Sequence, residues 1–386
     1  MLTRLQLKNW RSLRDVTIDD LTPITVFVGV NSSGKSNILD ALHFVRYAIE
    51  KGPLEAVLQW GGYERIRTVN ANNDDLTEIG FSFLPKAGED PITYNLKFRA
   101  ERGVTAFWFR EQITSGDAHW ERVTSGTSSI SPHGDVNVGL AVYLATDRSY
   151  ANTPIVTELL QYVTKRWQLL REGFVPMTEV AFSNTDSFFV IEPTARNLPK
   201  LLSFIRRSSP EQFKELQEDL HYLLNHVRKL SIQEDDRETR VLLTESSNLD
   251  QEAFTVSAGT ARILAMLAAI HINDWYLPNN PALVVVDEPD LAIHPLLLRN
   301  LLETIRMYAN YEVRETGPRG FLLTTHNPLL LDYFRPEEVR IVERDEQGFT
   351  TVNRVDPATA RYWLERDGAY NVGEMWRTGL IGGIPE

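Results

Sequence analysis

Hydrophobic positions in the first part of the chain follow two different periods. Residues 2–8 mix leucines with polar partners, and residues 24–28 form a short apolar run, so both segments are predicted to be strands. Between about 36 and 50, apolar residues recur at helical spacing. Because a glycine-bearing loop separates the second strand from this helix, the pattern predicts a strand–loop–helix unit.

Three segments further along the chain alternate apolar and polar residues and are separated by turn residues, at 78–84, 92–99 and 104–113. This pattern is typical of strands in an antiparallel meander. The stretch at 115–137 is rich in serine, glycine and threonine and is therefore predicted to be a loop.

The second half of the chain changes character. Helical patterns dominate from about 153 to 230, and Pro210 is expected to open a helix that runs to about Lys229 with one apolar face. Strands and helices then alternate: strands at 239–244, 282–286 and 320–324, and helices at 259–271 and 295–310. Such alternation predicts a parallel sheet covered by helices, and hence an α/β fold.

These patterns divide the chain into three predicted regions. Residues 1–150 form an N-terminal lobe that holds the glycine-bearing loop and the meander, residues 151–235 form an inserted helical subdomain, and residues 236–386 form a C-terminal lobe.

Composition limits the class of protein. Hydrophobic residues make up 42% and charged residues 24%, which is ordinary for a soluble globular chain. We find no apolar run that could span a bilayer and no secretory signal, so we expect no membrane association and a cytoplasmic location. The absence of cysteine excludes disulfides, thiolate zinc sites and cysteine nucleophiles. The net charge of −12 weighs against a protein built around nucleic-acid contacts, although a local basic patch remains compatible with DNA binding.

The motif with the most specific chemistry is Gly-Val-Asn-Ser-Ser-Gly-Lys-Ser at residues 29–36. Its glycines allow backbone N–H groups to turn around phosphate oxygens, and the following helix directs the positive end of its dipole at the same charge. Lys35 is expected to bridge the β- and γ-phosphates of ATP, and the Ser36 hydroxyl is expected to ligate Mg²⁺. An ordinary glycine turn is the alternative, but the strand before and the helix after the motif favour phosphate binding.

Two carboxylates follow a buried strand later in the chain. Asp287 and Glu288 come directly after the apolar residues 283–286. In a parallel sheet the carboxyl end of a strand faces the ligand crevice. Such a pair is commonly only solvated; together with the glycine-bearing loop, it predicts that Asp287 holds Mg²⁺ and that Glu288 polarises the attacking water.

Two further candidates depend more on context. His326 ends the apolar strand at 320–324, and we interpret it as a hydrogen-bond donor to the γ-phosphate rather than a base, although a lone histidine is more often structural. Ser257 precedes a helix, and its spacing alone indicates only an N-cap.

The order of these motifs resembles that of the ABC-type ATPase heads shared by RecF, SMC and OLD proteins. More narrowly, it is similar to the compact bacterial "AAA family ATPase" group related to the OLD nucleases. The resemblance rests on Asn-Trp-Arg-Ser at 9–12, the loop ending in Gly-Lys-Ser-Asn at 34–37, Ser-Ala-Gly-Thr at 257–260, Asp-Glu-Pro-Asp at 287–290 with Ile-His-Pro at 293–295, and Thr-His-Asn-Pro at 325–328.

The resemblance implies a nucleotide-sandwich homodimer, or a higher even oligomer, with ATP and Mg²⁺ as ligands. Ser257 and Gly259 of one subunit would contact the γ-phosphate held by the other subunit, and Asp290 would lie beside them at the interface. The family pattern places further nucleotide contacts at Asn9, Arg11, Asn31, Gly34 and Asn37.

Differences from other ABC-type proteins limit which members of the group this chain resembles. Ala258 and Thr260 replace the first glycine and the glutamine of the transporter signature, which disfavours a transporter subunit. Long heptad arms are absent, and the roughly 60 residues after His326 are too few for the nuclease domain of OLD proteins, so we expect a compact head. The glutamine that links the nucleotide to the rest of the head in relatives is not assigned; Gln59 is nearest in sequence.

Two functions remain open at this point. The first is a regulatory ATPase that controls a separately encoded effector, a nuclease or toxin, in bacterial antiphage defence. The second is a RecF-like DNA-repair ATPase that acts directly on DNA.

Overall fold

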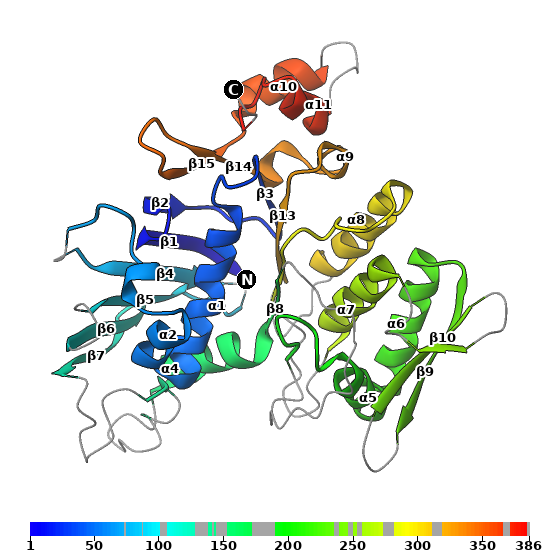
Figure 1. Cartoon of the computed structure of the whole chain (residues 1–386), viewed down its shortest axis with the longest axis horizontal. Helices are drawn as coiled ribbons and strands as arrows, with labels where there is room; N and C mark the ends of the chain where they lie inside the picture. The colour runs from blue at the N-terminus through cyan, green and yellow to red at the C-terminus, as the bar shows by residue number, and fades with distance from the viewer. Residues whose placement is uncertain are drawn as a thin grey trace.

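The computed structural model describes most of the chain. It leaves out residues 73–74, 87, 101–105, 128–137, 141–142, 144–152, 172–189, 235–238, 246–249, 253–256, 273–281, 311–318, 366–370 and 384–386. Two six-stranded sheets and a smaller three-stranded sheet form the framework of the described part, with helices packed around the sheets (Figure 1).

The first sheet is an antiparallel meander, as predicted. Its order is β2-β1-β4-β5-β6-β7, and its strands are β1 (Leu2–Trp10), β2 (Leu13–Ile18), β4 (Thr77–Phe83), β5 (Ile92–Ala100), β6 (Ala106–Ser115) and β7 (Ala118–Thr127).

The predicted loop at 115–137 is wrong where it covers β7; residues 128–137 lie outside the described residues. The turn between β6 and β7 needs a glycine at Gly116, whose φ is 51°, and β7 then pairs with the whole length of β6. Trp120 is buried, and Arg122 forms a buried ion pair with Glu111 of β6. Serine and threonine are compatible with a strand when cross-strand contacts of this kind hold it.

The second sheet carries the predicted parallel strands at 282–286 and 320–324, whereas the strand predicted at 239–244 pairs antiparallel in the three-stranded sheet. The order of the second sheet is β15-β14-β3-β13-β12-β8, and its strands are β3 (Ile24–Val28), β8 (Trp167–Leu170), β12 (Leu283–Val286), β13 (Gly320–Thr325), β14 (Val339–Arg344) and β15 (Thr350–Arg354). All neighbours run parallel except the β14–β15 hairpin. Strands β3, β8 and β12 of this sheet come from the three different predicted regions. The predicted boundaries at residues 150 and 235 therefore divide the strands of a single sheet.

Alternate side chains of the parallel sheet belong to two different cores. On β3, Val26 and Val28 belong to one core and Phe27 to the other; on β12, Val284 and Val285 are divided in the same way. A parallel strand that is covered on both faces reads as a continuous apolar run for this reason.

The core around Phe27 joins the parallel sheet to the antiparallel one. It also holds the apolar side chains of α1 (Lys35–Lys51), with α2 (Pro53–Gln59), η1 (Tyr63–Arg65), α4 (Pro154–Leu160) and η3 (Gln161–Lys165) in the same region (Figure 1). Helix α1 is therefore fixed along its length between the two sheets, and its first turn lies at the end of β3.

The other core lies under four helices: α5 (Leu198–Ser208), α6 (Pro210–Leu223), α7 (Ala258–His271) and α8 (Pro295–Ala309). The predicted helix from Pro210 to Lys229 is too long, since α6 ends at Leu223. Strand β9 (Val227–Glu234) follows and pairs with β10 (Thr239–Glu245), which pairs with β11 (Asp250–Glu252). Buried Leu223 and Val227 are four residues apart, which continues the helical spacing of α6 past its end and explains the overextended prediction.

The last described elements are short. They are α9 (Pro328–Leu331), η4 (Pro336–Glu338), α10 (Pro357–Glu365) and α11 (Val372–Arg377). Helix α11 packs on α9, close to the end of β13. Across the described ranges, every helix is too short or too polar to cross a bilayer.

Candidate functional site

The glycine-bearing loop at 29–36 connects β3 to the first turn of α1, and it packs against the β14–β15 hairpin. A Cβ atom on Gly29 would lie 2.1 Å from the Val342 carbonyl oxygen. A Cβ atom on Gly34 would lie 2.1 Å from Oγ1 of Thr350, and Gly34 has a φ of 116°, which favours glycine. Close packing therefore requires a glycine at both positions, and the backbone conformation favours glycine at Gly34 as well.

Helix α1 begins at this loop without the usual side-chain cap. Gly34 is the N-cap residue, and the first turn contains no acidic side chain. Lys35 is 5% exposed, and its Nζ donates to the carbonyl oxygens of Gly29 at 2.8 Å and Val30 at 3.0 Å. An uncapped helix end, together with an ammonium group held over the loop, suits a phosphate group.

Ser36, in the first turn of α1, and Asp287, directly after β12, lie close together at the carboxyl edge of the parallel sheet. The Ser36 hydroxyl lies 3.5 Å from Oδ1 of Asp287, which is 7% exposed and also accepts a hydrogen bond from Oγ1 of Thr324. No cluster of three or more histidine, aspartate or glutamate side chains suited to a metal occurs in the described part of the chain. Magnesium is typically held by one or two protein oxygens with phosphates and water completing its shell, so this hydroxyl–carboxylate pair fits Mg²⁺.

Glu288 has a strained backbone that is held on both sides. Its φ is 52°. Its N–H donates to Oγ1 of Thr324 at 2.9 Å, and its carbonyl oxygen accepts from Nη2 of Arg262 at 2.7 Å. Its carboxylate contacts Nδ1 of His326 at 2.7 Å. A left-handed backbone in a non-glycine residue costs free energy, and such outliers cluster at functional sites.

Arg262 is a site residue that the sequence did not reveal. It lies on α7, is buried, and donates to the carbonyl oxygens of both Asp287 and Glu288. Because its guanidinium ties α7 to the backbone that carries both carboxylates, Arg262 positions them. A single arginine inside an apolar helix carries no local signal of this role.

The Ser-Ala-Gly-Thr segment has structural roles within one chain. The Ser257 hydroxyl accepts a hydrogen bond from the N–H of Thr260 at 3.1 Å, which makes it the N-cap of α7. A Cβ atom on Gly259 would lie 2.4 Å from the Ala292 carbonyl oxygen, so the glycine permits close packing on the segment after Glu288. In that segment Asp290 accepts from Oγ1 of Thr325 at 3.0 Å. Contact of Ser257 or Gly259 with a second subunit stays a prediction.

Asn9 and Arg11 differ in where they point. Asn9 is buried with a φ of 53°; its amide accepts from the N–H of Thr68 and donates to the carbonyl oxygen of Asp75. These bonds use its side chain to hold the loop before β4. Arg11 instead reaches α1, where it contacts Oδ1 of Asn37 at 3.4 Å.

Asn37 and Asn31 lie on either side of the loop's glycine-lysine pair. Asn37 donates to Oγ of Ser12 at 2.7 Å, so it joins the β1–β2 turn to the first turn of α1. Asn31 is exposed on the loop. Gln59 lies at the end of α2 and lines a pocket beside α1, together with Arg11, which leaves the linking glutamine unassigned.

Two more residues missed by the sequence analysis support the loop from the far end of the chain. The Thr350 hydroxyl donates to the Ser33 carbonyl oxygen at 2.7 Å. Arg344 donates twice to the Ser32 carbonyl oxygen, at 2.9 and 2.7 Å, and burial lowers its pKa. More than 300 residues separate these partners in sequence, so no local pattern could identify them.

Removal of the Arg262 guanidinium is expected to reduce catalysis more than nucleotide binding. Arg262→Met keeps the bulk of the side chain and frees the carbonyl groups of Asp287 and Glu288, so kcat for ATP hydrolysis should fall about 10- to 100-fold, as misplaced catalytic groups typically cause. ATP affinity should stay within a few-fold. Steady-state phosphate release, with a separate nucleotide titration, measures both.

Arg262→Lys is the conservative control, because one ammonium donor should restore part of kcat. Thermal unfolding of both variants would show whether the fold is kept. Equal losses of affinity and kcat in Arg262→Met would contradict a positioning role.

Two family models of ATPase domains match parts of this chain. Residues 1–86 match a family model described as an AAA ATPase domain, and residues 145–332 match one described as "AAA domain, putative AbiEii toxin, Type IV TA system". An OLD nuclease of Thermus scotoductus is 23% identical over 92% of this chain. The chain covers 64% of that protein's length. A DNA replication and repair protein RecF of Lactococcus lactis is 32% identical over 16% of this chain and 18% of its own.

Solved structures show the same fold at low identity. The Smc head domain of Pyrococcus furiosus bound to the C-terminal domain of ScpA has a TM-score of 0.58 and 13% identity, over 94% of this chain and 98% of its own. A second Smc head, bound to the winged-helix domain of ScpA, has a TM-score of 0.59 and 15% identity, over 93% and 99%. The predicted fold class is therefore confirmed: an α/β head with the fold of these Smc heads, in which an antiparallel meander accompanies a parallel sheet covered by helices.

Proposed function

We propose that this chain, an ABC-type member of the AAA-family ATPases, binds ATP with Mg²⁺ and hydrolyses it to ADP and phosphate. One observation carries the proposal: the phosphate loop, Ser36, Asp287, Glu288 and His326 converge at the carboxyl edge of one parallel sheet. Ligands of open α/β sheets bind at this edge. Steady-state phosphate release by the purified chain with ATP and Mg²⁺ tests it directly.

The proposed chemistry assigns each residue one task. Lys35 and the backbone N–H groups at the start of α1 bind the phosphates, while Ser36 and Asp287 hold Mg²⁺, which supplies positive charge at the phosphate oxygens. Glu288 accepts a hydrogen bond from the attacking water and orients it. The contact of His326 with Glu288, at 2.7 Å, supports a role at the γ-phosphate side.

We further propose that the active unit is a homodimer or a higher even oligomer. Ser257 is exposed at the start of α7, and Leu291 and Leu296 are 42% and 79% exposed near the segment that packs on Gly259. Exposed apolar side chains beside an exposed helix start support an interface there. Ser257 and Gly259 would then complete the partner's site.

A mixture of two inactive variants is expected to recover activity. Ser257→Arg should bind ATP yet fail to hydrolyse it as a homodimer, because its bulk and charge would face the partner's γ-phosphate. Lys35→Ala subunits should be inactive as well. A mixed dimer keeps one intact composite site, with its phosphate loop from the Ser257→Arg chain and its Ser257 from the Lys35→Ala chain. The mixture should therefore release phosphate at a measurable fraction of the wild-type rate.

Subunit exchange must be shown separately, for instance by capture of a tagged subunit. Ser257→Ala, which removes only the cap, is the control for the introduced bulk. An active Ser257→Arg homodimer would show that Ser257 is a helix cap and nothing more.

For the biological role we propose a regulatory ATPase that controls a separately encoded effector, a nuclease or toxin, in bacterial antiphage defence. The family model at 145–332 supports this, since its description names a putative toxin system. Plaque assays with the gene and its genomic neighbours, in wild-type and Lys35→Ala forms, test the role; equal phage titres in both would contradict it.

A RecF-like ATPase acting directly on DNA is the second candidate, supported by the RecF match over 16% of this chain. The cations of the helical region give it little support, since Arg206 and Arg207 both pair with Glu234, and Arg166 is buried. Tight binding to bare DNA with a steep salt dependence would favour this candidate.

A further inference from the structure

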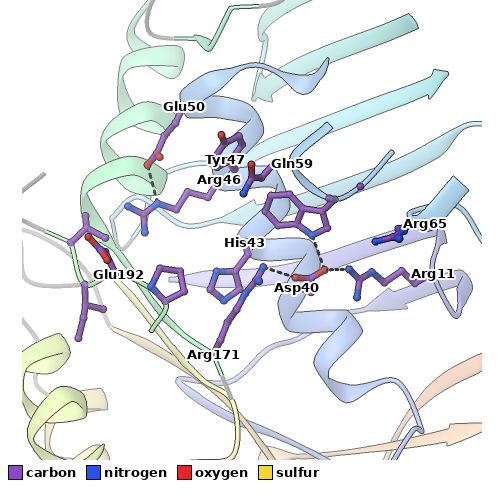
Figure 2. Close-up of a pocket in the computed structure, with 15 residues that line it drawn as sticks. Arg11, Asp40, His43, Arg46, Tyr47, Glu50, Gln59, Arg65, Arg171 and Glu192 are labelled. Carbon is purple, nitrogen blue, oxygen red and sulfur yellow. Dashed lines mark hydrogen bonds and ion pairs between the residues drawn. The ribbon is translucent and has the colours of Figure 1, made fainter. Parts of the chain in front are cut away.

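A pocket of about 640 Å³ lies beside α1, one helical turn beyond the phosphate loop. Figure 2 shows its lining, which comes from the β1–β2 turn, one side of α1, the chain after α2, Arg171 after β8, and residues 190–193. No residue of the 29–36 loop lines it, and neither do Asp287 and Glu288. It is therefore a separate cavity next to the proposed ATP site.

One end of the pocket holds an excess of positive charge. Arg11 and Arg171 both pair with Asp40, at 2.8 and 2.6 Å, so two guanidinium groups share one carboxylate. Arg65 is exposed at the same end, and no carboxylate in the described part of the chain forms an ion pair with it (Figure 2). Three guanidinium groups against one carboxylate suit a phosphate, because one guanidinium can donate two parallel hydrogen bonds to two phosphate oxygens.

The opposite end holds two carboxylates and one arginine. Glu50 and Glu192 lie there, away from Arg11 and Arg65 (Figure 2). Arg46 at this end is already engaged, because it pairs with Glu50 at 2.9 Å and donates to the Trp167 carbonyl oxygen at 3.1 Å. The separation of Asp40 from Glu50 along α1 is about 15 Å, at 1.5 Å per residue. A ligand anionic at one end and rich in hydrogen-bond donors at the other matches this lining.

A flat surface lies near the cationic end. The Trp60 indole is fixed by a hydrogen bond from its Nε1 to Asp40 at 2.8 Å. The Arg171 guanidinium lies 5.5 Å from the centre of the Trp60 ring, and the Tyr47 ring centre lies 5.8 Å from that of Trp60. Nucleobases stack on aromatic rings and on guanidinium planes of this kind.

His43 adds a polar group without a partner. It is 6% exposed, lines the pocket, and its Nε2 has no hydrogen-bond partner. Burial, together with the charges of Arg171 and Arg46, holds its pKa well below the usual value, so the ring is neutral. His43 therefore contributes a neutral ring, and no charge, to the wall of the pocket.

We propose that this pocket binds a nucleotide distinct from the hydrolysed ATP. Its phosphate contacts Arg11, Arg65 and Arg171, its base stacks beside Trp60, and its amino or hydroxyl groups face the end that holds the two carboxylates. A free mononucleotide and the 5′-phosphorylated end of a single strand share this chemistry, and the experiment distinguishes them.

The test uses the full chain with Lys35→Ala, which removes the phosphate-loop contact and leaves the pocket intact. AMP and GMP are titrated calorimetrically, and a 5′-phosphorylated, 3′-fluorescein-labelled ten-residue oligo-dT is titrated by anisotropy. At least one probe should bind. Adding Arg65→Ala should weaken that binding about tenfold or more, because one charge-assisted phosphate contact is lost. Adding Trp60→Leu should weaken it by a similar factor through lost stacking.

Arg299→Ala is the matched control, because Arg299 is an exposed arginine on α8 that pairs with Glu303 outside the pocket. It should leave binding within twofold. Binding of AMP or GMP identifies a free nucleotide; binding of the phosphorylated oligomer alone, lost without its 5′-phosphate, identifies a strand end. The proposal is overturned if no probe binds at millimolar concentration, or if Arg65→Ala and Trp60→Leu bind unchanged. ATP hydrolysis by the wild-type chain is measured separately. Failure of the pocket proposal can therefore be told apart from failure of the proposed ATPase function.

Discussion

Lys35→Ala is expected to weaken ATP binding by about 10- to 100-fold, the range for loss of one charged hydrogen-bond donor. The Lys35 ammonium is held over the loop by the carbonyl oxygens of Gly29 and Val30, where it faces any phosphate bound at the start of α1. Alanine removes this charge and leaves the glycine turn, whose shape depends on the β14–β15 hairpin. Equilibrium titration with a fluorescent ATP analogue measures the effect.

Lys51→Ala is a matched control, since Lys51 is an exposed lysine at the other end of the same helix. Its removal should leave the affinity unchanged. If Lys35→Ala also binds the analogue as the wild type does, the phosphate loop is not the nucleotide site and the proposed function is lost with it.

Glu288→Gln is expected to bind ATP normally and to hydrolyse it about 10²- to 10⁴-fold more slowly, the usual contribution of a positioned acid–base group. The amide keeps the size of the side chain and loses the charge that orients water. The backbone clamp from Thr324 and Arg262 is made by main-chain atoms of Glu288, so the substitution leaves it in place. Single-turnover phosphate release after ATP loading separates binding from chemistry.

Glu303→Gln serves as its control, because Glu303 is a surface glutamate paired with Arg299. It should hydrolyse ATP at the wild-type rate. Turnover of Glu288→Gln within a few-fold of wild type would mean that another group orients the water.

The phosphate loop and the Asp-Glu pair could be recognised in the sequence because each of them is a local pattern. The phosphate loop combines a turn, two glycines and a helix start within eight consecutive residues, and the Asp-Glu pair directly follows its strand. Parallel strands place their carboxyl ends at one edge, so the meeting of Ser36 with Asp287 followed from the α/β pattern. Periodicity located the meander for the same reason, because alternation depends on neighbours along the chain.

Local pattern was insufficient where long-range pairing decides the conformation. The segment that forms β7 is rich in turn-forming residues, yet β6 and the buried Arg122–Glu111 pair hold it as a strand. Leu223 and Val227 have the four-residue spacing of a helix, yet Val227 pairs with Glu245 of β10 and begins a strand. Side-chain contacts across the sheet outweigh the intrinsic preference of such segments.

The tertiary structure alone decided the surroundings of the site. Arg262 reaches the carbonyl groups of Asp287 and Glu288 from a mostly apolar helix, and Thr350 reaches the phosphate loop from a strand more than 300 residues away. Asn9 belongs to a motif that resembles a nucleotide contact, but its amide is used by Thr68 and Asp75. Sequence specifies which chemical groups exist and how they recur locally, whereas the partner that satisfies a buried polar group is set by which distant segments pack together.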